Sequence, residues 1–222
     1  MSKVIVGEIE GPSTTSNKIT IASGSQLDIA GSPGGSGAIN LAVDAGDITT
    51  GTLASARIPN GSVLQVVSTT KTDTATFSST TTNTFVDLAG LSVTITPTSA
   101  SSKILVFFTV NVTRSSSATQ HVRLMRDTTA IGVGDAAGSR LQDTVITRDS
   151  PSGDVPYTLW IGNLNGSYLD SPSTTSATVY KLQGTLGVTY SGTFYINRSG
   201  DDANADYGGR PISSITVMEI KA

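Results

Sequence analysis

The chain has 222 residues, only 14% of them charged, and its formal net charge at pH 7 is −3. Without a basic excess, neither a duplex-binding face nor a patch for anionic membranes is expected, so we predict no nucleic-acid partner. The sequence holds 33 Thr and 30 Ser but no Cys, which excludes disulfides and thiolate metal sites and makes hydroxyl groups the main polar surface. This composition favours strands and turns over helices.

Residues 1–62 are expected to form an extended N-terminal segment of short strands. They contain no aromatic residue, and positions 31–37 are a flexible run rich in glycine and serine. Three short alternating stretches are strand candidates: Val4–Val6, Lys18–Ile21 and Gln26–Ile29. Such a segment buries too little apolar surface to order itself, so we expect copies of the chain or a larger assembly to hold it.

Neither a secretion signal nor a membrane span is predicted. The apolar run Val4–Val6 is too short for the apolar part of a signal peptide. The longest apolar run, Ile104–Phe108, is far below the ~20 residues that a transmembrane helix needs. We therefore expect a soluble chain that does not insert into membranes.

Residues 63–222 carry the strand patterns and are predicted to form one antiparallel β domain. Alternation of apolar and polar residues between turn residues is typical of half-buried strands. The predicted strands are 63–70, 84–88, 91–96, 103–113, 121–124, 130–133, 142–148, 156–161, 177–184, 190–197 and 212–220. Many short strands without a helical period indicate an all-β sandwich or jelly roll.

Two of these strands are apolar on both faces. In 103–113 the main apolar face runs through Val106 and Phe108, yet Leu105 and Phe107 occupy the opposite face. Strand 212–220 behaves similarly. Either another subunit or loops of the same domain could cover the second face, and both alternatives stay open. The residues predicted for an oligomer interface are Leu105, Phe107, Ile212, Met218 and Ile220.

Several stretches resemble structural proteins of tailed bacteriophages. Residues 47–59, DITTGTLASARIP, resemble an ITxGTLxxARxP element of phage tail fibres, and the opening MSKVIVGEIE with NKITI at 17–21 is similar to the N-termini of small proteins of short-tailed marine phages. Residues 168–172, 178–183 and 213–220 look like the terminal domain of many phage fibres. That domain resembles the trimeric jelly roll of complement C1q and tumour necrosis factor.

The resemblance implies a homotrimeric virion protein. Its jelly roll, residues 63–222, would present a surface for host attachment, and residues 1–62 would anchor it to other phage structural proteins. In that family one apolar sheet face lines the three-fold axis. A tail-fibre or adaptor role is expected first, with a capsid-attached head fibre or decoration protein, or a glycan-binding module, as alternatives.

No catalytic site is predicted. His121 is the sole histidine, alternation places it outward, and no Gly-x-Ser-x-Gly element accompanies it, so a Ser-His-Asp triad is not expected. A glycosidase needs paired carboxylates beside a groove. The pairs Asp143 with Asp149 and Asp201 with Asp202 both lie in turn-like stretches. We expect a protein that is not an enzyme.

No metal or cofactor is predicted either, although the loop at 201–209 is the most acidic stretch. Asp202, Asn204 and Asp206 have the spacing of the first three EF-hand ligands, but Tyr207 replaces the glycine and Ser213 the bidentate glutamate. A solvated turn is the expected structure, with a weak calcium site as the alternative.

Exposed tyrosines give one candidate for glycan binding. A sugar ring stacks its apolar face on an aromatic side chain while polar neighbours bind its hydroxyls. Tyr168 and Tyr207 lie in turn-rich stretches and are the predicted contacts for a host cell-surface glycan. Trp160 is expected to pack inside the sandwich instead.

Overall fold

A computed structural model describes residues 57–222 except 80–82, 116–117, 149–158, 188–191 and 207. The described residues form eleven strands: β1 (Val63–Lys71), β2 (Ala75–Ser79), β3 (Val86–Ile95), β4 (Lys103–Arg114), β5 (Thr119–Arg126), β6 (Thr129–Ile131), β7 (Val145–Thr147), β8 (Gly162–Asp170), β9 (Thr178–Gly187), β10 (Gly192–Ile196) and β11 (Ser213–Ile220). In these ranges no helix is long and apolar enough to cross a membrane. The short strands predicted before residue 57 lie outside the described residues.

Three pairs of these strands are halves of longer strands. β1 pairs with β11 and β2 pairs with β10, so β1 and β2 run along β11 and β10 as one interrupted edge. β10 and β11 in turn pair with successive parts of β4. β6 and β7 likewise pair with successive parts of β5. Residues 72–74 connect β1 to β2, and two longer excursions of the chain, at 132–144 and 197–212, connect the other halves.

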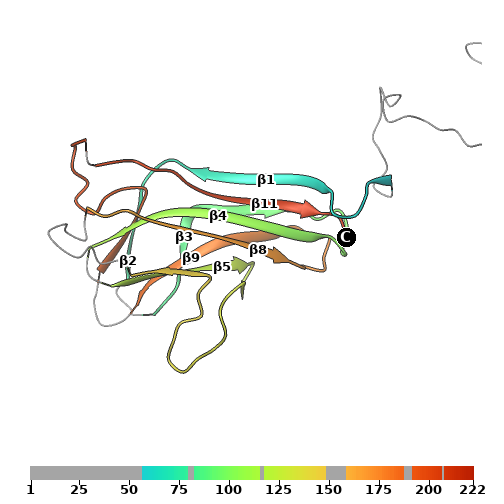
Figure 1. Cartoon of the computed structure of the whole chain (residues 1–222), viewed down its shortest axis with the longest axis horizontal. Helices are drawn as coiled ribbons and strands as arrows, with labels where there is room; N and C mark the ends of the chain where they lie inside the picture. Colours follow the sequence, from blue (N-terminus) through green and yellow to red (C-terminus); the bar gives the residue numbers. More distant parts are fainter. Residues whose placement is uncertain (1–56, 80–82, 116–117, 149–158, 188–191, 207) are drawn as a thin grey trace, which may run out of the picture. The chain divides into compact units, whose positions relative to one another are not determined.

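The eight resulting strands build two antiparallel sheets with jelly-roll connectivity. Sheet A has the order β8, β4, β10/β11, β1/β2, and sheet B has the order β6/β7, β5, β9, β3. Counted along the chain, the first strand pairs with the eighth, the second with the seventh, the third with the sixth and the fourth with the fifth, as in a jelly roll. In Figure 1 the long strands of the two sheets, among them β1, β4 and β9, run in roughly the same direction across the view. The predicted all-β jelly-roll fold is confirmed.

The core lies between the sheets and follows from alternation along the strands. Every second residue of β4, from Ile104 to Val112, is buried, and Ile215 and Val217 of β11 continue the same layer. Sheet B contributes the opposing side chains, Leu91, Val93, Ile95, Val122, Leu124, Tyr180, Leu182 and Leu186. Burying an aliphatic side chain of this size stabilises the fold by roughly 1.5–3 kcal/mol relative to leaving it exposed.

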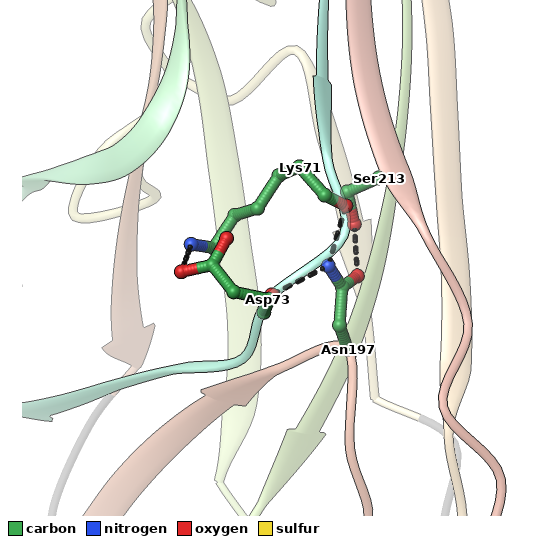
Figure 2. A network of polar contacts seen from close by, with 4 residues as sticks. All are labelled: Lys71, Asp73, Asn197 and Ser213. Atoms are coloured by element: carbon green, nitrogen blue, oxygen red, sulfur yellow. Dashed lines mark hydrogen bonds and ion pairs between the residues drawn. The ribbon is translucent and has the colours of Figure 1, made fainter.

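A buried polar cluster holds sheet A together where β1/β2 and β10/β11 are interrupted (Figure 2). The Asn197 amide nitrogen donates to the carbonyl oxygens of Lys71, at 2.9 Å, and Asp73, at 3.0 Å. The Ser213 hydroxyl donates to Asn197 Oδ1 at 2.6 Å. Asn111 of β4 donates its backbone N–H to the Ser213 hydroxyl. Three strands are thus linked where ladder hydrogen bonds stop.

Asn197 is fully buried and has a φ of 58°, in the left-handed region that Asn tolerates better than most residues. Asn197→Ala should therefore lower the free energy of unfolding by about 2–4 kcal/mol, because it leaves buried carbonyls unpaired and strains the backbone. Urea denaturation measures this. Asn83→Ala is the matched control, because Asn83 has a φ of 62° but is exposed. A similar loss in both variants would show that the polar cluster adds nothing.

Candidate functional site

The outer face of sheet A carries an apolar row that crosses all four strands. Strand register places Val66 of β1 beside Met218 of β11, Met218 beside Leu105 of β4, and Leu105 beside Leu169 of β8. Val66 is 55% exposed and Leu169 48%, although both belong to a continuous row. A row of large apolar side chains open to solvent is a typical feature of an interaction surface.

The following rows are polar but uncharged, with one exposed aromatic ring. Phe107, which is 43% exposed, lies between Thr216 of β11 and Ser167 of β8. We call this surface the neutral face. It extends along β1 from Val66 to Thr70 and across the sheet to β8. Its residues are Val66, Ser68, Thr70, Leu105, Phe107, Thr109, Asn111, Asn163, Asn165, Ser167, Leu169, Ser214, Thr216 and Met218. None of these residues carries a charge.

The structure brings four of the five predicted interface residues together. Leu105, Phe107 and Met218 belong to the neutral face, and Ile220 adjoins it, opposite Val63 of β1. Ile212 lies beyond the other end of β11, where its carbonyl accepts a hydrogen bond from the Asn111 side chain. It is 55% exposed but separated from the apolar row by the polar rows. That these residues form a subunit contact stays a prediction.

Sequence reasoning missed Val66 and Leu169. Val66 stands in the run Val66-Val67, where two adjacent apolar residues hide which one faces out. Leu169 belongs to β8, a strand that was not predicted. The pairing of β1 with β11 and of β8 with β4 identifies both as surface residues of the same row.

The outer face of sheet B has the opposite character. Lys181 pairs with Asp87 at 2.7 Å, and the hydrogen bond from Lys181 is the main cause of a lowered pKa for Asp87. The Arg123 guanidinium donates to Gln183 Oε1 and stacks 4.0 Å from the centre of the Phe85 ring. Charged groups paired with one another in this way suit a face that stays in water.

His121 is on this side of sheet B, opposite Val122 and Leu124, but it is not a surface residue. It is only 9% exposed, so the expectation that it lies on the surface is wrong. The excursion 132–144 supplies the cover, because His121 Nδ1 lies 2.7 Å from Asp143 Oδ2. The other ring nitrogen packs against Gly187, where a Cβ would approach to 2.3 Å. Both ring nitrogens are therefore enclosed by protein. Asp149, the predicted partner of Asp143, lies outside the described residues.

The acidic loop is organised by arginines. Asp202 accepts from Arg198 at 2.6 Å through one carboxylate oxygen and from Arg210 through the other. Arg198 also stacks on Tyr195, and Asp201 accepts from the Ser199 hydroxyl. The described residues contain no group of three or more His, Asp or Glu side chains that could hold a metal ion. A calcium ion would have to displace both arginines from Asp202.

The two predicted glycan contacts differ in what the structure describes. The Tyr168 ring packs against Gly132, and the residue is 37% exposed. Tyr207 lies outside the described residues. Trp160 is partly buried. A role of Tyr168 or Tyr207 in glycan contact stays a prediction.

The chain enters the sandwich beside its C-terminal residues, at what we call the basal end (Figure 1). Gly61 donates its N–H to the Lys221 carbonyl, and Lys221 donates to the Ser62 carbonyl. Buried Glu219 binds the nearby 96–102 connection through Thr98, whose N–H and hydroxyl both donate to Oε1. β2, β4, β7 and β9 end at the opposite, distal end, at Ser79, Arg114, Thr147 and Gly187.

Two solved structures that align with part of this chain come from infectious bursal disease virus, the structure of its Gx strain and the crystal structure of its VP2 subviral particle. Both are 13% identical to this chain with a TM-score of 0.36. The alignments cover 69% and 71% of this chain but 37% of each viral chain, so the chain spans little more than a third of their length. Values this low transfer no property to this protein. No family model and no curated protein matches the sequence.

Glu219 should make the stability of the basal end sensitive to acid. Burial acts to raise its pKa, but hydrogen bonds from Thr98 and Gln65 help to outweigh burial and hold the pKa below the ordinary value of 4.5. Its stabilisation is therefore complete above pH 4.5 and is lost as the pH falls through the lower, folded-state pKa.

Below pH 4.5 the free energy of unfolding should consequently fall more steeply in the wild type than in Glu219→Gln, which cannot titrate. Denaturation curves at pH 3 to 6 test this, with the exposed Asp135→Asn as a control that should follow the wild type. Identical slopes for wild type and Glu219→Gln would contradict the assignment.

Proposed function

We propose that this protein is a non-enzymatic structural component of the virion of a tailed bacteriophage. Residues 1–62 anchor it to tail or capsid proteins, and a homotrimer of the jelly-roll domain serves host attachment. The observation that carries the proposal is the contrast between the two sheets: the outer face of sheet B is charged, whereas the neutral face of sheet A holds an exposed apolar row. The sequence resemblance to phage fibres supports the same conclusion.

An uncharged surface is well suited to contact with its own copies. Residues close to the axis of a cyclic homo-oligomer meet their own copies, so charges of one sign at that position would repel one another. The neutral face has no such conflict, and association would remove Val66, Phe107 and Leu169 from water. Sheet B, with its ion pairs, would then form the outside of the assembly. A cyclic trimer follows from the resemblance to the C1q and tumour necrosis factor jelly roll.

The two ends of the sandwich support an anchoring role for the N-terminal segment. The chain enters at the basal end, where Gly61 and Ser62 bind Lys221. The connections that follow β2, β4, β7 and β9 leave at the distal end. If the basal end faces the particle, the distal connections face the host. A host cell-surface glycan is the proposed ligand, and loss of adsorption in Tyr168→Ala or Tyr207→Ala virions would support it. Tyr168 pairs with Val106 of β4, nearer the basal than the distal end, so loss of adsorption in Tyr168→Ala would assign the glycan to the side of the sandwich and not to the distal connections.

Self-association can be tested with one pair of variants. Phe107→Glu puts a charge into the neutral face and should convert the full-length trimer into monomers, because three carboxylates would be buried together. Ile146→Glu is the matched control, since Ile146 of β7 is 54% exposed on sheet B, and it should leave the mass unchanged. Light scattering measures both. A monomeric wild type, or a Phe107→Glu variant that stays trimeric, would contradict the proposed interface.

The place of the protein on the particle can be determined by electron microscopy of virions labelled with antibodies against the jelly-roll domain. Label at the tail is the result expected for a fibre or adaptor. Label over the shell would instead assign the protein to the capsid as a head fibre or decoration protein. Purified virions that carry no label and no copy of the chain would refute a virion role.

A further inference from the structure

The polar end of the neutral face contains a ladder of three amide side chains. Asn165 Nδ2 donates to Asn163 Oδ1 at 3.1 Å, and Asn163 Nδ2 donates to Asn111 Oδ1 at 3.1 Å. Asn111 Nδ2 then donates to the Ile212 carbonyl at 2.7 Å. The ladder crosses from β8 to β4 and ends beside β11. Asn163 and Asn165 are exposed, and Asn111 is half-buried.

The ladder gives the neutral face two unlike ends. The apolar row, with Val66 and Leu169, lies toward the basal end, and the amide ladder lies toward the distal end. Between them stand hydroxyl residues and Phe107. Along β4 the two ends are six residues apart, from Leu105 to Asn111, which corresponds to about 20 Å.

We infer that the ladder formed by Asn111, Asn163 and Asn165 sets the register in which copies of this chain pack through the neutral face. The inference rests on the proposed self-association and adds a specificity element to it. Each amide still has hydrogen-bonding capacity directed outward, since an Asn side chain offers two donors and two acceptor sites. A copy that covers the ladder must satisfy this capacity with polar groups or water.

The energetics favour one register over shifted ones. An apolar side chain placed over the ladder would leave amide groups buried without partners, which is unfavourable for each group. Shifting the copy along the strands would bring its apolar row over the ladder and also expose the apolar row of the first copy. In coiled coils a buried Asn likewise selects register and oligomer state, at some cost in stability.

Without the ladder, the neutral face would not distinguish one packing register of the copies from another. Its remaining rows are small hydroxyl and apolar side chains, which pack against one another in many offsets. The proposed role of the ladder is therefore to exclude alternatives, whereas the apolar row supplies the affinity.

The double variant Asn163→Val/Asn165→Val of the full chain tests the inference by size-exclusion chromatography with light scattering. The wild type should give a single oligomeric mass. The double variant should instead give several masses, including larger assemblies. Thr109→Val/Ser167→Val is the matched control, because it adds apolar surface to the same face with the ladder intact, and it should keep the wild-type mass. If the double variant does not fold, as judged by circular dichroism, Asn165→Val alone provides the same test at the exposed end of the ladder.

The possible results test the register role of the ladder and the self-association of the chain separately. A wild type and a ladder variant that share one oligomeric mass would overturn the register role and leave self-association standing. Equal heterogeneity in the control would also overturn it, because added apolar surface would then be the cause. A monomeric wild type would refute the self-association itself, and the register role with it.

Discussion

The pairing of β4 with β11 in the middle of sheet A determines which side chains enter the core and which face outward. It aligns Val106 with Val217 on the inner side, where they enter the core. The same register aligns Leu105 with Met218 on the outer side, where they form half of the apolar row. Because strand residues alternate strictly between faces, one register fixes both layers. A slip by one residue would bury the polar rows and expose the core.

Buried polar groups in this fold are kept where strands are interrupted or where layers meet. Asn197 and Ser213 bridge the gap between β10 and β11. Asp170 of β8 accepts hydrogen bonds from Tyr180 of β9 and from Arg126 of β5, so it links sheet A to sheet B. Burial and the bond to Asp170 raise the pKa of Tyr180, which therefore stays a neutral donor. These links use inward-facing side chains, so the outer faces of the two sheets can differ in charge and apolar character. That difference is the basis for proposing an assembly.

The sequence allowed the fold class and most strands to be predicted, because alternation in 91–96, 103–113 and 213–220 depends only on local pattern. It did not reveal β2 or β8, and the described part of the predicted strand 156–161, residues 159–161, is not a strand. The residues of β8 include Asn163, Asn165 and two glycines. Gly166 is needed there because the Phe108 ring packs over it, and a Cβ would approach the ring to 2.7 Å. Likewise, the alternation assigned His121 to the correct side but could not show that the excursion 132–144 covers it. Contacts between distant segments decided both cases.

In the proposed assembly the neutral face of sheet A is buried between copies of the chain, while sheet B stays in water. Hydroxyl-radical footprinting of the full-length protein tests this arrangement, since Met218 and Phe107 report on one face and Ile146 on the other. We expect strong protection of Met218 and Phe107 relative to the same residues in a dissociated sample, with Ile146 labelled equally in both. Equal labelling of Met218 and Phe107 in the two samples would contradict it.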